Sequence, residues 1–127
     1  MNTPTILLIE DDLMLSNMYV EKFTLEGFRV LTSRNGEDGV RIAKEERPDL
    51  ILLDLILPRL SGIDVLVLLN QDSNTKKIPV LVLTNVAEQN QSKKALKFGA
   101  KEYLVKAMYT PEEIVAKVKR YLNVNPL

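Results

Sequence analysis

The sequence predicts a single α/β domain in which five strands alternate with five helices. Five short runs rich in Ile, Leu and Val recur along the 127 residues, and segments whose apolar residues follow helical spacing lie between them. Three of these runs are apolar nearly throughout, which is typical of strands covered on both faces. The alternation therefore predicts a (βα)5 fold, a parallel sheet with right-handed crossovers and helices on both faces.

The expected strands are runs that are mostly too short to form independent helices. They are TILLIE (5–10), FRVLT (28–32), DLILLD (49–54), PVLVLT (79–84) and EYLVK (102–106). After the first run, Met18, Tyr19 and Phe23 follow helical spacing and predict the apolar face of the first helix.

The expected helices start or stop at recognisable signals. Gly27 and Gly99 are suitable stops for the first and fourth helices, and Pro48 discourages continuation of the second. Thr110 and Glu113 form the capping-box pattern at the start of the fifth helix. The helices are expected at 13–26, 36–46, 63–70, 88–98 and 110–122.

Composition narrows the classes of function. The chain has no cysteine and no histidine, which excludes disulfides, thiolate metal sites and imidazole chemistry on this chain. Net charge is zero, but the charges are unevenly distributed. Residues 1–58 contain 11 acidic and 6 basic residues, and residues 59–127 contain 6 acidic and 11 basic residues. The N-terminus does not resemble a signal peptide, and no apolar segment reaches the ~18 residues of a membrane span. We therefore expect one cytoplasmic domain over 1–127, with its core at about 5–122 and no membrane contact.

Polar side chains lie at the carboxyl ends of four of the five expected strands. Glu10 and Asp11 follow the first strand, Asp54 ends the third, Thr84 ends the fourth and Lys106 ends the fifth. The carboxyl ends of parallel strands meet at one edge of a sheet, and ligands bind there in open α/β folds. We therefore expect these groups to gather at one edge, with Asp54 at the point where an apolar strand reaches the surface.

Three carboxylates in one crevice repel one another, and Lys106 supplies only one positive charge. A divalent cation would balance the site. The available ligands are hard oxygens, which favours Mg²⁺. Mg²⁺ usually binds through one or two carboxylates together with a phosphate, so Thr84 and Lys106 are expected to surround an anionic group such as a phosphoryl.

Four motifs, in this order and spacing, resemble the receiver domain of bacterial response regulators. They are LLIEDD (7–12), LLDLILP (52–58), VLVLTN (80–85) and GAKEYLVK (99–106), and the resemblance runs from about Ile6 to Leu122. It implies a flavodoxin-like, doubly wound sheet with strand order 2-1-3-4-5. It also implies a phosphoryl-accepting switch of a two-component system.

The resemblance assigns the metal and acceptor positions residue by residue. Asp54 matches the phosphoacceptor, which takes its phosphoryl group from a sensor histidine kinase or phosphotransfer protein. Asp11 matches the direct Mg²⁺ ligand, Glu10 the neighbour that acts through a metal-bound water, and Ile56 the backbone carbonyl ligand. Asp12 falls one position beyond the acidic pair and is expected to cap a helix instead.

The same resemblance implies how the signal leaves the site. Lys106 and Mg²⁺ would neutralise charge on the transferring phosphoryl group. Thr84 would bond the new phosphoryl group, and Tyr103 would turn inward to follow it. This switch would reshape the face built from the fourth helix, fifth strand and fifth helix. The expected reader is a downstream protein or an output domain, with no direct contact to nucleic acid.

This chain departs from the family pattern near the site. Ala107 stands where a cis proline is usual, so either the loop is strained or it runs trans with Lys106 held less firmly. Asn85 is larger than the usual residue and narrows the entry for phosphodonors. Apolar Ile56 and Val86 are expected to restrict hydrolytic water and prolong the phosphorylated state.

The sequence leaves three alternative functions and the role of one lysine-rich surface undecided. A degenerate receiver would bind partners without phosphorylation. This alternative stays open because Asn85 and Ala107 depart from the family pattern. A Mg²⁺-dependent phosphohydrolase resembling haloacid dehalogenases would need an acid at position 56, where this chain has Ile56. A flavodoxin-like cofactor carrier would need a phosphate-binding loop after the first strand, where this chain has acidic residues. Six lysines in the second half predict a solvated face or an acidic partner: Lys93, Lys94, Lys97, Lys101, Lys117 and Lys119.

Overall fold

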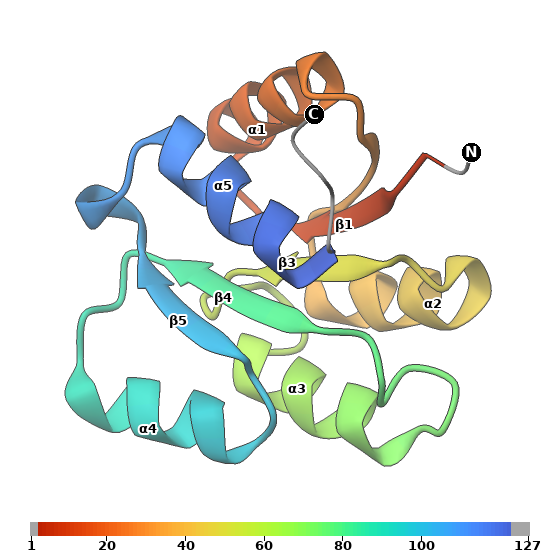
Figure 1. The fold of residues 1–127 in the computed structure, drawn as a ribbon. Helices are drawn as coiled ribbons and strands as arrows, with labels where there is room; N and C mark the ends of the chain where they lie inside the picture. Colours follow the sequence, from red (N-terminus) through yellow and green to blue (C-terminus); the bar gives the residue numbers. More distant parts are fainter. Residues whose placement is uncertain (1–2, 123–127) are drawn as a thin grey trace.

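The computed structural model describes residues 3–122, and within them five strands alternate with five helices (Figure 1). The strands are β1 Thr5–Ile9, β2 Arg29–Ser33, β3 Leu50–Leu53, β4 Val80–Thr84 and β5 Glu102–Val105. The helices are α1 Leu13–Leu25, α2 Gly36–Glu46, α3 Gly62–Gln71, α4 Gln89–Lys97 and α5 Pro111–Leu122. The predicted elements are confirmed to within a few residues. A short 3₁₀ helix, η1 Lys106–Met108, was not predicted. The ends of the expected domain, 1–2 and 123–127, lie outside the described residues.

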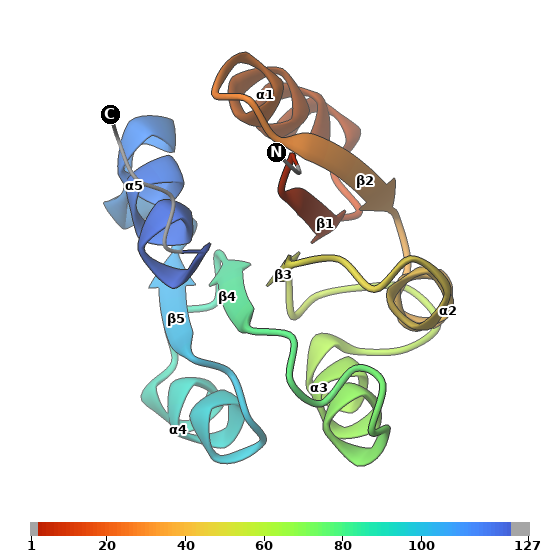
Figure 2. The ribbon, with the colours of Figure 1, turned by 45° about the vertical axis from the view of Figure 1, so that its right-hand side comes forward.

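All strand pairs are parallel, and the sheet order is β2-β1-β3-β4-β5. This confirms the predicted doubly wound topology. Helices α1 and α5 cover one face of the sheet, and α2, α3 and α4 cover the other (Figures 1 and 2). Ile9 is in register with Leu53, and Thr84 with Val105, so the carboxyl ends of the central strands form one edge.

Each face of the sheet carries its own apolar core. Successive residues of β1 alternate between the cores: Ile6 and Leu8 pack with α1 and α5, whereas Leu7 and Ile9 pack with α2, α3 and α4. Central strands covered on both sides must be apolar throughout, and β3 is fully buried over all four residues. The continuous apolar runs of the sequence follow from this packing.

Helix ends are fixed by the predicted caps. The Asp12 side chain accepts a hydrogen bond from the Leu15 backbone N–H at 3.1 Å, which confirms its expected role as a cap. Thr110 and Glu113 form the reciprocal capping box, with bonds of 2.8 and 3.2 Å. These caps set where α1 and α5 leave the edge of the sheet that carries the polar strand ends.

The inward face of α1 differs from the prediction in one position. Ser16, Tyr19 and Phe23 are buried, whereas Met18 is 38% exposed. Met18 lies beside Met14 and Leu25 on the outer face, since these positions recur with helical spacing. The prediction for Met18 was therefore wrong, and α1 carries an exposed apolar stripe.

Candidate functional site

Asp54 lies immediately after β3, at the edge where that apolar strand reaches the surface. Its backbone N–H donates to the Ile9 carbonyl at 3.0 Å, which ties it to β1. Its carboxylate accepts a hydrogen bond from Lys106 Nζ at 3.0 Å and one from the Ile56 N–H at 3.3 Å. The carboxylate is thus both paired with a cation and close to solvent, with the whole residue 8% exposed.

Lys106 sits between two carboxylates. Its Nζ lies 2.5 Å from Glu10 Oε1 as well as 3.0 Å from Asp54 Oδ2, and its side chain is 8% exposed. Residues 3–122 contain no cis peptide bond, so the Lys106–Ala107 bond is trans. The loop turns instead through η1, whose first residue is Lys106. The ammonium therefore reaches both acids without the proline of the family pattern.

Burial and ion pairing act against each other on these groups. Burial raises the pKa of the Glu10 carboxyl, and the hydrogen bonds from Lys106 and from the Asp12 N–H only partly oppose it. Burial disfavours the charged form of Lys106, but the hydrogen bonds to Glu10 and Asp54 outweigh it and raise the pKa of Lys106. Lys106 therefore stays protonated at neutral pH and is the cation that keeps the two acids together.

A cavity of about 360 Å³ opens over this ion pair. Asp11, Asp54, Thr84 and Lys106 line it, together with Glu10, Asp12, Leu15, Ile56 and Asn85. Asp11 is exposed at the cavity, and among the described residues no three acidic side chains converge into a ready metal cluster. The predicted convergence therefore holds for Glu10, Asp54 and Lys106, while Asp11 shares the cavity without joining them in a tight cluster.

The donor set of this cavity fits Mg²⁺. The side chains of Asp11 and Asp54 offer hard oxygens, and Ile56, which carries the expected carbonyl ligand, lines the same space. Mg²⁺ keeps several waters and needs only one or two protein carboxylates, so a three-acid cluster is not required.

Thr84 and Tyr103 meet at the same loop residue. Thr84 is fully buried, and its Oγ1 accepts a hydrogen bond from the Val86 N–H at 3.3 Å. The Tyr103 hydroxyl donates to the Val86 carbonyl at 2.6 Å. The backbone of Val86 therefore connects the hydroxyl at the cavity to the aromatic ring on β5. The sequence predicted both ends of this connection but not Val86 as its middle.

Of the remaining predicted residues, Ile56 and Asn85 line this cavity, whereas Val86 and Ala107 do not. Ile56 is 68% exposed, Val86 is half-buried and Asn85 is exposed at the cavity. Ala107 is exposed and is not among the residues that line the cavity.

Gly62, which lies just before the third helix as predicted (63–70), holds the loop after Asp54. Its N–H donates to the Leu55 carbonyl at 2.9 Å. A Cβ atom at this position would lie 2.5 Å from both the Asp54 carbonyl oxygen and Leu55 Cα. Only glycine permits this approach, so Gly62 positions the backbone that carries Asp54 and Ile56. Its place after a helix cap, Ser61, was the available signal.

A second ion-pair network lies on the face of β5 and α5. Glu102 accepts hydrogen bonds from Lys117 at 2.9 Å and from the Tyr121 hydroxyl at 2.7 Å. Lys117 also lies 5.6 Å from the centre of the Tyr109 ring. Lys119 pairs with Glu26 at 2.9 Å. Lys117 and Lys119 are therefore paired with acids of the same chain, while their side chains stay partly exposed.

An acidic pair after β1, an acid after β3, a hydroxyl at the end of β4 and an amine after β5 share one edge of a 2-1-3-4-5 sheet. This combination defines a signalling receiver of two-component systems. The model of the response regulator receiver domain matches residues 6–119, and the chain belongs to this family.

Relatives of known name agree with this family. The chain is 36% identical over 119 residues to the phosphate regulon transcriptional regulatory protein PhoB of Rhizobium meliloti, covering 94% of this chain and 52% of PhoB. It is 29% identical over 118 residues to the polar-differentiation response regulator DivK of Brucella anthropi, covering 93% and 95%. The chain thus spans about half the length of PhoB and nearly all of DivK.

Solved structures show the same fold. The receiver domain of the sensor histidine kinase PA1611 from Pseudomonas aeruginosa, with a magnesium ion coordinated in its active site cleft, matches with a TM-score of 0.88 and 28% identity. That match covers 97% of this chain and 100% of the other. Chemotaxis protein CheY4 of Vibrio cholerae matches with a TM-score of 0.87 and 23% identity, over 94% of this chain and 99% of CheY4.

None of the described helices is long and apolar enough to cross a membrane.

Proposed function

We propose that Asp54 is the phosphoacceptor of this receiver domain. The observation that carries the proposal is a carboxylate at the end of β3, 3.0 Å from an ammonium group and facing an open cavity. The chain has no histidine, so the phosphohistidine belongs to a sensor kinase or phosphotransfer protein. A carboxylate oxygen attacks phosphorus, the P–N bond breaks, and the imidazole nitrogen keeps the electron pair.

Residues of the chain prepare this transfer by position and charge. Lys106 holds the Asp54 carboxylate in place and lies where it can pair with the incoming phosphoryl oxygens. Asp11, Asp54 and the Ile56 carbonyl would hold Mg²⁺, and Glu10 would act through a bound water. When bound, the ion supplies positive charge against the phosphoryl oxygens. The chain assists its own modification in this way and acts as a switch rather than as an enzyme with a separate substrate.

The connection through Val86 supports the proposed relay. A phosphoryl group on Asp54 offers acceptor oxygens to the Thr84 hydroxyl, which now accepts from the Val86 N–H. Movement of Thr84 changes that contact, and the Tyr103 hydroxyl donates to the carbonyl of the same residue, Val86, in the next peptide unit. The change then passes to the face formed by α4, β5 and α5, which a downstream protein or an output domain would read.

The exposed apolar stripe of α1 supports a docking surface for the phosphodonor. Met14, Met18 and Leu25 are 84%, 38% and 77% exposed, and Met14 lies two residues from Asp12 at the cavity. Methionines adapt to a partner surface, and exposed apolar stripes mark interaction sites. We propose that residues 1–127 act as one cytoplasmic receiver unit that receives its phosphoryl group across this stripe.

Intact-mass measurement after incubation with Mg²⁺ and a small phosphodonor tests the proposal. Wild type should gain one phosphoryl group, and Asp54→Asn should gain none. Asp49→Asn is the matched control, because Asp49 immediately precedes the same strand, at the end opposite Asp54, and its replacement should leave phosphorylation intact. Equal modification of wild type and Asp54→Asn would contradict the assignment. No modification of either would favour the phosphorylation-independent binding module.

A further inference from the structure

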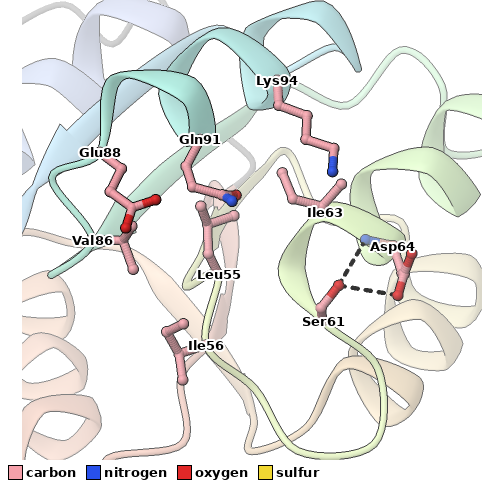
Figure 3. Close-up of a pocket in the computed structure, with 9 residues that line it drawn as sticks. All are labelled: Leu55, Ile56, Ser61, Ile63, Asp64, Val86, Glu88, Gln91 and Lys94. Carbon is pink, nitrogen blue, oxygen red and sulfur yellow. Dashed lines mark hydrogen bonds between the residues drawn. The ribbon is translucent and has the colours of Figure 1, made fainter.

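A second cavity of about 440 Å³ forms a groove between α3 and α4 (Figure 3). Its apolar lining comes from four side chains: Leu55, Ile56, Ile63 and Val86. Leu55 is buried, Ile63 and Val86 are half-buried, and Ile56 is 68% exposed. Ile56 also lines the cavity over Asp54, so the groove begins where the phosphorylation site ends. We call these lining residues, together with Glu88, Gln91, Lys94, Ser61 and Asp64, the α3–α4 groove.

The α4 wall of the groove carries two opposite charges that find no partner in residues 3–122. Glu88 is the N-cap of α4 but makes no capping bond through its side chain, and Lys94 is exposed. Neither takes part in an ion pair among the described residues. Six residues of helix separate them by about 9 Å along the axis. On the opposite wall, Asp64 accepts a hydrogen bond from Ser61 and is already engaged (Figure 3).

We propose that the α3–α4 groove binds an amphipathic helix of a partner protein, which runs antiparallel to α4. Its aliphatic face would fill the apolar lining, as in other helix-in-groove complexes. An acid near its N-terminus would meet Lys94, and a base about two turns later would meet Glu88. This direction is also the one that helix dipoles favour, because acids stabilise the first turn of a helix and bases the last.

Binding in this groove is coupled to the switch through Val86, and this coupling rests on the proposed function. Val86 contacts the occupant with its side chain, while its backbone bonds both Thr84 and Tyr103. A change at Thr84 on phosphorylation therefore alters the wall of the groove. By linkage, the change in the peptide's affinity caused by phosphorylation equals the change in phosphorylation equilibrium caused by the peptide.

Two synthetic helical peptides of about 15 residues test the groove. Both carry leucines at i, i+3 and i+7; one has Glu before and Lys after them, and the other has these two charges exchanged. Titration into labelled protein, followed by NMR, should shift the methyl signals of Ile56, Ile63 and Val86 but not those of the remote, 77% exposed Leu25. Exposed ion pairs are individually weak, so the matched peptide should bind roughly three- to tenfold more tightly than the exchanged one.

The double variant Glu88→Lys/Lys94→Glu should reverse this preference, a result that loss of folding cannot imitate. Equal affinity of both peptides, or shifts outside the groove, would overturn the proposal. So would a concentration-dependent dimer that shifts the same methyl signals without peptide, because the occupant would then be a second copy.

Phosphorylation supplies a separate measurement. The peptide affinity of wild type should change after incubation with phosphodonor, and that of Asp54→Asn should not. An unchanged affinity in protein shown by mass to be phosphorylated would overturn the coupling and leave the proposed function standing. Charge-dependent peptide binding by protein that the phosphodonor does not modify would overturn the proposed function, and the coupling with it, but would leave the groove as a binding site.

Discussion

Replacement of Lys106 by methionine removes the only cation that contacts Glu10 and Asp54 among the described residues, while keeping a side chain of similar length. Both acidic oxygens lie within 3.0 Å of the same nitrogen, so they lie within about 6 Å of each other. At that separation and an effective dielectric constant of about 20, two negative charges repel by about 3 kcal/mol. We expect Lys106→Met to lower the free energy of unfolding by about 2 to 3 kcal/mol at neutral pH.

This loss should depend on pH in a defined direction. Burial already raises the pKa of Glu10 above its ordinary 4.5, and without Lys106 the pKa rises further. Stability linked to a raised folded-state pKa is present below the unfolded value and is lost as pH rises through the folded value. Urea unfolding of both proteins should therefore show a small difference near pH 4.5 and a larger one toward neutral pH.

The double variant Asp54→Asn/Lys106→Met provides the control. It leaves Glu10 as the single buried acid of the pair, so the repulsion disappears and much of the lost stability should return. A stability difference that does not vary with pH, or a double variant less stable than Lys106→Met, would show that packing rather than charge explains the effect.

Three further changes test separate parts of the structure. Gly62→Ala should lower the free energy of unfolding by about 2 kcal/mol in urea unfolding, since its Cβ would lie 2.5 Å from the backbone of Asp54. Tyr121→Phe should cost about 1 kcal/mol through its bond to Glu102, and the cost should fade as pH rises toward the Tyr121 pKa of about 12. Ile56→Asn should shorten the lifetime of the phosphorylated protein, measured by loss of the phosphoryl mass, because water gains access.

Each of these changes has an outcome that would contradict its reasoning. Unaltered stability of Gly62→Ala would mean that the loop has room to move. A Tyr121→Phe effect that persists at high pH would assign the loss to packing, since the hydroxyl ionises and its donated proton is gone. A longer phosphoryl lifetime in Ile56→Asn would show that the apolar side chain does not exclude water.

The sequence was sufficient for the fold because periodicity and burial agree. β3 is buried on both faces, and its sequence is an unbroken apolar run, which predicts a strand. α5 combines a capping box with an apolar face, and both features predict a helix. The edge of the sheet could also be predicted, since parallel strands bring their carboxyl ends together whatever their order. The residues that end β1, β3, β4 and β5 were therefore predicted to meet, and Glu10, Asp54 and Lys106 do so.

Features that depend on three-dimensional packing could not be predicted in this way. The bond between Tyr103 and the Val86 carbonyl joins a side chain to a backbone atom 17 residues away, and periodicity carries no information on such contacts. The pairing of Lys117 with Glu102 depends on how α5 crosses β5. Met18 was assigned to the wrong face because its spacing fits the buried stripe almost as well as the exposed one.

If Asp54 is phosphorylated as proposed, the charge at the site explains why one lysine is not enough. Four acids line the cavity, namely Glu10, Asp11, Asp12 and Asp54, whereas Lys106 supplies the single positive charge of its lining. In the proposed function, Asp54 exchanges its single charge for a phosphoryl group with about two, so the imbalance grows as the reaction proceeds. Lys106 cannot neutralise the phosphoryl group and also keep its bonds to both acids. A divalent cation at Asp11 and Asp54 would relieve this conflict, and so would release of Glu10 as Lys106 turns toward the phosphoryl group. In the proposed function, the acids at the cavity thus hold Lys106 in place at rest and would create the need for a metal ion when the switch is used.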